Sequence, residues 1–342
     1  MTLRVGMLAP ISWRVPPRHY GPWERVVSLL TEGLVERGVD VTLFATADSV
    51  TAARLEAVCP RPLLEDSELE AKVWESLHVG NAFEHASELD LIHNHYDFLP
   101  LSYTGLVSTP VVTTVHGFSS DRIRPAYRRY DGRVAYVSVS DADRDPALRY
   151  AATVYHGIDL AEFTPRARPG EPLVFLGRIH PDKGVADAIA VAKAVGRPLV
   201  IAGIVHDAGY FEREVAPHLD GERVRYVGSV GPRDRDALLG GAYALLHLVE
   251  FAEPFGLSMV EAMACGTPVI ARRRGSIPEV IDEGVTGLIV DDVAGAIEAV
   301  RHAGSLDRRQ VRARAAERFS RDRMVDDYLA VYENVLAGSR VR

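Results

Sequence analysis

The chain has 342 residues, of which 47% are hydrophobic and 25% are charged, and its formal net charge is −8. This length exceeds what a single hydrophobic core usually supports, so two domains are expected. The composition is that of an ordinary globular protein, and the negative net charge argues against nonspecific binding of nucleic acid.

The cysteines and the apolar segments indicate the cellular setting. Only two cysteines occur, Cys59 and Cys265, far apart and without the spacing of metal ligands, which fits a reduced environment. No apolar run approaches the roughly 20 residues that span a membrane. The opening run Leu3–Ala9 is too short for a signal peptide and ends at Pro10. We therefore expect a cytoplasmic protein with no strong membrane association.

The first half of the chain alternates between strands and helices, as in a doubly wound sheet. Leu3–Ala9 and Val39–Ala45 are predicted strands, and Trp23–Arg37 between them has the apolar spacing of a helix. Further strands are predicted at Leu91–His95, Pro110–His116, Arg133–Ser140 and Ala152–Tyr155. In such sheets, ligands bind at the carboxyl ends of the strands.

The loop before the first helix lacks the G-x-G-x-x-G pattern of dinucleotide-binding folds. It contains Gly21 and Pro22, followed by Trp23 and Glu24. The proline removes one backbone N–H and stiffens the turn, which makes this backbone a poorer ligand for phosphate.

Histidines at two predicted strand ends are candidate site residues. His93 and His95 stand two positions apart and so project to the same side of a strand. A metal site would need further ligands, which the neighbouring sequence does not offer. We expect His95, with Tyr96 and Asp97, to reach the cleft at the end of the strand. His116 ends the next strand, where it is either a site residue or a hydrogen-bonded structural histidine.

Two charged segments bear on the kind of binding partner. Glu65–Leu89 is acidic and partly helical, the wrong charge for an anionic membrane surface, which favours a soluble partner. Five arginines lie in the stretch from Arg122 to Arg133. They are either solvated surface or a site for a phosphate-bearing or acidic partner.

The second half repeats the wound pattern after a polar connector that contains Pro165 and Pro169. The predicted helices are Val185–Val195 and the terminal Asp322–Leu336. The predicted strands are Leu173–Leu176, Pro198–Ile204, Arg223–Val230, Tyr243–Val249, Pro268–Ala271 and Leu288–Val290.

The first strand of this half ends in Gly177-Arg178, and Lys183 and Gly184 follow just before a helix. Glycines and two cations in a turn before a helix suit a diphosphate. A structural ion pair between Lys183 and the neighbouring Asp182 is the alternative.

The stretch Glu253–Gly266, EPFGLSMVEAMACG, lies between two predicted strands. Pro254 suits the first turn of a helix, which places Glu253 at or beside the N-cap. Glu261 follows eight residues later, about 12 Å along a helix. This separation suits an elongated ligand with hydroxyl groups at both ends, such as a nucleotide diphosphate sugar. The alternative is an amphipathic helix with two solvated glutamates.

Together these segments resemble retaining GT-B glycosyltransferases of glycosyltransferase family 4 (glycosyl transferases group 1). The resemblance is carried by Glu253–Val269, by the G-R-x-x-x-x-K-G element in Gly177–Gly184, and by His116 in a T-x-H-G context. The stretch His156–Asp159 resembles the family's link between domains. Gly21-Pro22 stands where the family usually has two adjacent glycines.

The resemblance implies an α/β GT-B fold: two Rossmann-like doubly wound domains facing a central cleft, with the C-terminal helix crossing back to the N-terminal domain. The expected acceptor domain is 1–160 with helix 321–338, and the expected donor domain is 161–320. No cofactor beyond the nucleotide-sugar co-substrate is implied.

The resemblance also assigns roles. Arg178 and Lys183 would stabilise the leaving diphosphate in place of a metal, Glu261 would hold the ribose, and Glu253 and His116 would meet the donor sugar. The other residues expected to bind the nucleotide or its diphosphate are Gly203, Val230, Phe255, Gly256 and Leu257. The loops expected to lie near the acceptor contain Gly21, His95 and Asp97.

The implied activity is metal-independent transfer of a hexosyl or pentosyl group from a nucleotide diphosphate sugar to a hydroxyl acceptor, with retention of configuration. The acceptor is expected to be a soluble oligosaccharide or secondary metabolite, as in carbohydrate or antibiotic biosynthesis. Two alternatives are a nucleotide-sugar epimerase of similar architecture and a noncatalytic nucleotide-sugar sensor.

Overall fold

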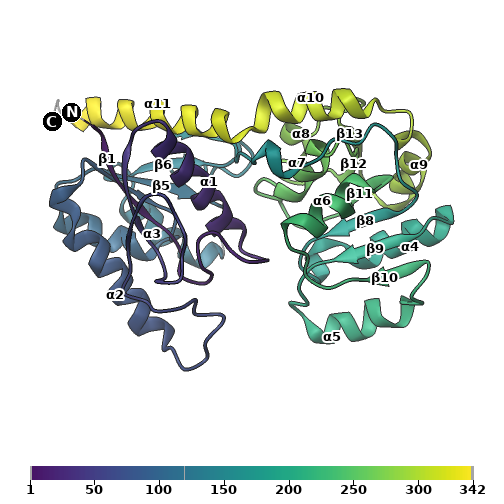
Figure 1. The fold of residues 1–342 in the computed structure, drawn as a ribbon, viewed down its shortest axis with the longest axis horizontal. Helices are drawn as coiled ribbons and strands as arrows, with labels where there is room; N and C mark the ends of the chain where they lie inside the picture. The colour runs from purple at the N-terminus through teal and green to yellow at the C-terminus, as the bar shows by residue number, and fades with distance from the viewer. Residues whose placement is uncertain (1, 119, 340–342) are drawn as a thin grey trace. The chain divides into compact units, whose positions relative to one another are not determined.

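The computed structural model describes residues 2–118 and 120–339 (Figure 1). The chain divides into two compact units: Met1–Gly157 with Arg321–Arg342 form the first unit, and Ile158–Ser320 form the second. Each unit is built on a parallel sheet with helices packed against it. The predicted α/β class with two doubly wound units is confirmed.

The first unit contains a seven-stranded sheet in the order β3-β2-β1-β4-β5-β6-β7, with every pairing parallel. The order reverses at β1, which lies between β2 and β4, and this is the switch point where such sheets bind ligands. The strands are β1 (Arg4–Leu8), β2 (Asp40–Phe44), β3 (Arg54–Glu56), β4 (Leu91–Asn94), β5 (Val111–Val115), β6 (Ala135–Ser138) and β7 (Tyr150–Thr153).

The helices of the first unit bury aromatic and aliphatic side chains against this sheet. Tyr127, Tyr136, Tyr328 and Tyr332 are among its largest fully buried residues. The helical segments are α1 (Pro22–Glu36), α2 (Ala71–Glu84), η1 (Ala86–Glu88), η2 (Leu99–Leu106), η3 (Asp121–Ile123), α3 (Arg124–Arg129) and α11 (Arg321–Ser339).

The second unit contains a six-stranded parallel sheet in the order β10-β9-β8-β11-β12-β13. Its strands are β8 (Leu173–Leu176), β9 (Leu199–Ala202), β10 (Val224–Tyr226), β11 (Ala244–His247), β12 (Val269–Arg272) and β13 (Gly287–Val290). The strand predicted over 223–230 ends early, at Tyr226, because Gly228 has a φ of +75°, which no strand can contain.

The helices of the second unit include several that the sequence did not predict, among them α6, α9 and α10. Its helical segments are η4 (Leu160–Glu162), η5 (Pro181–Lys183), α4 (Val185–Val195), α5 (Ala208–Tyr210), η6 (Phe211–Val215), η7 (Ala216–His218), α6 (Pro232–Gly240), α7 (Leu257–Ala264), α8 (Ile277–Val280), α9 (Val293–Ala303) and α10 (Arg308–Phe319). In the part of the chain that the structure describes, no helix combines the length and apolar character needed to cross a membrane.

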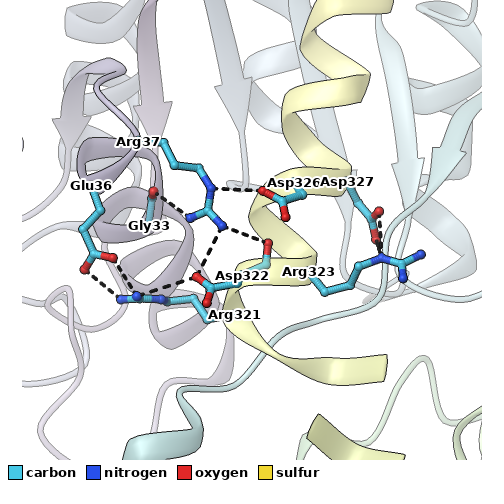
Figure 2. Close-up of polar contacts among 8 residues, drawn as sticks. All are labelled: Gly33, Glu36, Arg37, Arg321, Asp322, Arg323, Asp326 and Asp327. Carbon is cyan, nitrogen blue, oxygen red and sulfur yellow. Dashed lines mark hydrogen bonds and ion pairs between the residues drawn. The ribbon is translucent and has the colours of Figure 1, made fainter. Parts of the chain in front are cut away.

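The C-terminal helix α11 packs along α1 in the first unit, as the sequence predicted (Figure 1). Ion pairs border this contact, as Figure 2 shows: Arg321 Nη2 lies 2.6 Å from Glu36 Oε2, and Arg37 Nε lies 3.0 Å from Asp326 Oδ1. The acidic partners, Glu36 and Asp326, are more than half exposed. Exposed ion pairs contribute at most about 1 kcal/mol each to the free energy of unfolding. Burial of α11 side chains such as Val325 therefore holds the helix in place.

Close approach of α1 and α11 depends on Gly33. A Cβ at this position would lie 2.5 Å from Val325 Cγ2. Val325 is completely buried, and β-branched side chains have few alternative rotamers in a helix. Gly33 is therefore required by packing between two helices that are about 290 residues apart in the chain.

We predict that Gly33→Ala destabilises the first unit by about 1–3 kcal/mol through overpacking. The control is Gly80→Ala in α2, where no described atom outside the helix's own backbone lies within 4 Å of the new methyl group. That change should stabilise by about 0.5–1 kcal/mol because alanine is the better helix former. Urea midpoints that shift in the same direction for both variants would contradict this packing account.

Candidate functional site

The strand ends of the second unit are brought close together by glycines. Gly177 N–H donates to Ala202 O at 3.0 Å, and Gly203 N–H donates to Gly228 O at 2.8 Å. Gly203 has a φ of +145°, and a Cβ on it would lie 1.8 Å from Gly177 O. Only glycine fits there, so the loop that carries Arg178 is held directly against the end of β9.

Lys183 ends the short η5 turn, which is docked on the chain after β11. Asp182 O accepts a hydrogen bond from Glu250 N–H at 2.8 Å. Gly184 follows in the left-handed region, where a Cβ would lie 2.0 Å from Leu248 O. Asp182 Oδ1 lies 2.6 Å from His180 Nδ1. The alternative of a Lys183–Asp182 pair is wrong, because Lys183 is paired elsewhere.

Lys183 is paired with Glu253, which is 7% exposed. Lys183 Nζ lies 2.9 Å from Glu253 Oε2, and His247 Nε2, at the end of β11, lies 3.2 Å from the same oxygen. Burial alone raises the pKa of Glu253, but the His247 hydrogen bond and the Lys183 charge outweigh it and lower the pKa to about 2. Glu253 is therefore ionised at neutral pH within a compact cluster of opposite charge.

The turn after β12 holds the loop around Glu253 in place through hydrogen bonds. Ser276 N–H donates to Glu253 O at 2.9 Å, and Ser276 Oγ donates to Phe255 O at 3.1 Å. A Cβ on Gly275 would lie 2.4 Å from Glu253 O, so this turn also depends on a glycine. The main chain from Glu253 to Phe255 is held in one position.

The helix after this loop begins later than the sequence suggested. α7 begins at Leu257, and its N-cap Gly256 has a φ of +84°. The prediction that Pro254 occupies the first turn is wrong, because a left-handed residue separates it from the helix. Glu253 lies before the N-cap and points to Lys183. The first N–H groups of α7, from Leu257 and Ser258, have no acceptor within the helix and suit an anion.

The second glutamate of the motif is also buried and paired. Glu261 is 5% exposed, and its Oε1 lies 3.2 Å from Arg235 Nη1 in α6. Arg235 Nη2 lies 3.4 Å from Glu162 Oε2. The alternative of two solvated glutamates is therefore wrong. Val230 is half-buried in the loop just before α6.

The first unit contains a row of histidines at the ends of β4 and β5. His95 Nδ1 lies 2.9 Å from His116 Nε2, and His116 Nδ1 lies 3.2 Å from His156 Nε2. On the inner side, His95 Nε2 lies 3.3 Å from His93 Nδ1. Trp23 stacks on His116 with ring centroids 5.1 Å apart. Sequence reasoning selected His116 and His95 but missed His156 and Trp23 as their partners.

The expectation that His95 reaches an acceptor at the strand end needs correction. Its side chain is completely buried, and both ring nitrogens face other histidines.

The structure also places the other two residues expected in the acceptor loops. Asp97, in the left-handed region at φ +70°, accepts a short hydrogen bond from the Tyr127 hydroxyl. Gly21 is the N-cap of α1 with φ +149°. Among residues 2–118 and 120–339, no group of three or more His, Cys, Asp or Glu is arranged so that it could hold a metal ion.

Two of the five arginines in the cluster of the first unit, Arg124 and Arg128, are paired with carboxylates. Arg124 Nη1 lies 2.9 Å and Arg128 Nη2 lies 3.6 Å from Asp145 Oδ2, and Arg124 Nε lies 3.1 Å from Asp121 Oδ1. The side chain of Asp145 is only 3% exposed. These pairs reduce the positive charge that the cluster could offer a phosphate.

Two family models together match residues 23–318 of the chain. "Glycosyltransferase Family 4" matches residues 23–162, and "Glycosyl transferases group 1" matches residues 163–318. The chain is 28% identical to a glycogen synthase of Mycobacterium tuberculosis over 93% of its own length and 90% of the relative's. It is 30% identical to a D-inositol 3-phosphate glycosyltransferase of Mycobacterium avium, covering 72% of this chain and 70% of the relative.

Solved structures share the fold. AviGT4, a glycosyltransferase involved in avilamycin A biosynthesis, has a TM-score of 0.73 at 24% identity, with 98% of each chain covered. Anabaena Alr3699/HepE, in complex with UDP-glucose, has a TM-score of 0.72 at 17% identity, with 97% of this chain and 100% of that chain covered.

The chain therefore belongs to glycosyltransferase family 4, the glycosyl transferases group 1, and has the GT-B fold. It is a nucleotide-sugar-dependent glycosyltransferase. The epimerase and sensor alternatives are set aside on this evidence.

We predict that the first unit loses stability as the pH falls below about 6.5, the unfolded pKa of histidine. Burial lowers the pKa of five of its histidines: His78 to about 4, His156 to about 3, and His93, His95 and His116 well below the usual value. A depressed histidine pKa means that the unfolded state binds more protons, so stability is complete above pH 6.5 and falls by about 1.4 kcal/mol per pH unit for each histidine.

Glu24 has the opposite effect on the pH dependence of stability, because burial raises its pKa to about 7. It offsets the proton uptake of only one of the five histidines on unfolding. Urea midpoints at pH 7.5 and 5.5 measure the slope. His78→Gln should reduce the slope by about one proton, whereas His302→Gln, an exposed position, should leave it unchanged. A midpoint that stays constant or rises between pH 7.5 and 5.5 would refute the prediction.

Proposed function

We propose that this enzyme moves a hexosyl or pentosyl group from a nucleoside diphosphate sugar to an acceptor hydroxyl, with retention of configuration and without a metal ion. The second unit binds the donor, and residues of the first unit bind the acceptor. The observation that carries the proposal is the buried cluster of Lys183, Glu253 and His247 beside the Arg178 loop.

Lys183 and Arg178 receive the diphosphate in this proposal. An ammonium group has three N–H donors, so the contact with Glu253 leaves two for phosphate oxygens. Arg178 is half-buried, two residues after the end of β8, in the loop that leads to the Lys183 turn. A cation about 4 Å from a phosphate charge contributes on the order of 4 kcal/mol before desolvation is subtracted, and it stabilises the leaving group as the glycosidic bond breaks.

Glu253 binds hydroxyls of the donor sugar. The described contacts of its side chain with Lys183 and His247 both fall on Oε2, which leaves Oε1 to accept a hydrogen bond. Since the low pKa of Glu253 keeps it ionised, this bond is charge-assisted and stronger than a neutral one. Glu261, oriented by Arg235, accepts hydrogen bonds from the ribose. Phe255, Gly256 and Leu257 supply main chain near the phosphates, and Gly203 and Val230 border the base.

His116 stabilises positive charge on the sugar and does not act as an obligatory base. Both of its ring nitrogens are already hydrogen-bonded to histidines. A double displacement needs a carboxylate nucleophile about 5 Å from its partner group, and Glu253 is committed to the hydroxyl side. The acceptor therefore attacks from the face that the diphosphate leaves, and a leaving phosphate oxygen takes its proton. Retention is typical of this family.

The acceptor is a hydroxyl group of a soluble oligosaccharide or secondary metabolite. Two of the similar proteins, a glycogen synthase and an enzyme of avilamycin A biosynthesis, support this kind of acceptor by their names, whereas a third is named for D-inositol 3-phosphate. The pairing of Arg124 and Arg128 with Asp145 favours an acceptor without phosphate at that surface.

We predict that the two glutamates fail in different ways. Glu261→Gln should weaken binding of a nucleoside diphosphate about 10- to 100-fold, because a charge-assisted hydrogen bond contributes about 1.5–3 kcal/mol. Glu253→Gln should leave that binding unchanged or tighter, since Lys183 loses a competing anion, while transfer falls. Calorimetry with UDP and an assay with UDP-glucose measure both, and Glu222→Gln on the exposed surface is the control. The reverse pattern would overturn the donor orientation.

We predict that the first product formed has the anomeric configuration of the donor and that a chelator does not slow its formation. Arg178 and Lys183 supply the charge that a metal would otherwise bring to the diphosphate. An NMR time course of the anomeric proton, with and without EDTA, tests both parts. An inverted first product would refute the stereochemical mechanism. Loss of activity with EDTA that Mn²⁺ or Mg²⁺ restores would refute the role of the two cations.

A further inference from the structure

Arg272 ends β12 and is buried beside the chain that leaves β11. It is 4% exposed, and β12 is paired with β11 as far as His247. Arg272 Nη2 lies 2.6 Å from Asp187 Oδ2, and Nη1 forms an ion pair with Glu250 Oε1. Nη1 also donates to Leu248 O at 3.5 Å. One guanidinium group therefore holds a carboxylate of α4 and, beside it, the chain that follows β11.

The two carboxylates belong to the segments that carry the proposed diphosphate ligands. Asp187 lies in the first turn of α4, four residues after Lys183. Glu250 lies three residues before Glu253, and its main-chain N–H donates to the Lys183 turn. Arg272 thus joins the same two segments that the Lys183–Glu253 ion pair joins.

The ammonium group of Lys183 is held by side chains of the segment from Glu250 to Glu253. Lys183 Nζ lies 4.3 Å from the centroid of the Phe251 ring and 2.9 Å from Glu253 Oε2. A cation over an aromatic face is attracted to it, whereas the lysine stem by itself is flexible. The ammonium group therefore keeps its place only while this segment keeps its place beside the Lys183 turn.

The charge of Arg272 is no help to an anionic ligand. Its guanidinium group is buried, and its single positive charge faces two carboxylates, so the three groups together are negative. A net negative charge repels a diphosphate. What Arg272 offers the site is geometry, because the planar guanidinium fork can meet two carboxylates at once, which the ammonium group of a lysine does poorly.

We propose that Arg272 is a positioning residue for the donor diphosphate, which sets the spacing between the Lys183 turn and the Glu250–Glu253 segment by pairing with Asp187 and Glu250. This inference rests on the proposed function, in which the diphosphate lies between these two segments. A site whose groups already stand at the right spacing loses less free energy to ordering when the ligand binds. Arg272 itself touches no ligand and acts through Lys183.

Three variants separate this role from a general effect on folding. Arg272→Lys keeps the charge but loses the fork. Glu250→Gln removes one of the two ion pairs at a side chain that is 49% exposed, where the fold tolerates change. Asp282→Asn is the matched control, because Asp282 pairs with Arg314 and Arg318 of α10 in the same unit.

The binding arm compares UDP, measured by calorimetry, with uridine, measured by ligand-observed NMR. Arg272→Lys and Glu250→Gln should each weaken UDP binding about tenfold and leave uridine binding unchanged, since Lys183 meets only the diphosphate. Charge alone predicts the opposite for Glu250→Gln, because loss of a carboxylate favours an anion. Asp282→Asn should bind both ligands as the wild type does. Unchanged or tighter UDP binding in either variant, or equal losses for UDP and uridine, would overturn the proposal.

A double variant tests whether Arg272 acts through Lys183. In a Lys183→Met background, Arg272→Lys should weaken UDP binding by no more than about twofold further, because residues that act as a unit are not additive. A second full tenfold loss would show that Arg272 acts independently of Lys183, which contradicts the proposal.

Hydrogen–deuterium exchange without nucleotide tests the positioning role apart from the donor. Arg272→Lys should speed exchange at residues 182–187 and 248–253, whereas Asp282→Asn should leave both segments unchanged. Unchanged exchange in Arg272→Lys would overturn the inference. If the exchange result is as expected and the wild type binds no UDP, the proposed function alone is wrong.

Discussion

Parallel strand pairing is the constraint on which both halves of this protein depend. All strands of one sheet end at the same edge, so residues distant in sequence meet there. In the second unit this edge brings Gly177, Gly203 and His247 together, and in the first it brings together His95 and His116. The chemistry of the protein follows from which side chains stand at these positions.

The second unit buries two carboxylates at this edge and provides a cation for each. A buried, unpaired carboxylate would be protonated or strongly destabilising. Lys183 with His247 and Arg235 prevent this for Glu253 and Glu261, respectively. In the proposed donor site these side chains also contact the ligand, so the groups that stabilise the buried carboxylates suit an anionic, hydroxyl-rich molecule. The first unit differs, because burial lowers the pKa of the histidines in its row and so keeps these rings neutral.

Local sequence patterns predicted most of the strands, though not the short β3, and they singled out the Arg178–Lys183 turn and the two glutamates, because apolar runs, glycines and motif spacing are local signals. They could not predict ion pairs between distant positions, such as Lys183 with Glu253 or Arg235 with Glu261. The start of α7 was misplaced because proline is favoured in a first helical turn, whereas the left-handed Gly256 delays the helix. The histidine row escaped prediction for the same reason as the ion pairs, since neighbours in the row such as His116 and His156 are 40 residues apart.

We propose that the second unit holds the nucleoside diphosphate of the donor between its Arg178–Lys183 loop and the Glu253–Glu261 segment. Hydrogen–deuterium exchange of the full chain with and without UDP tests this placement, because exchange reports each segment separately. Exchange at residues 177–184 and 253–261 should slow when UDP is bound. Unchanged exchange in these two segments, with protection confined to the first unit, would show that the placement is wrong.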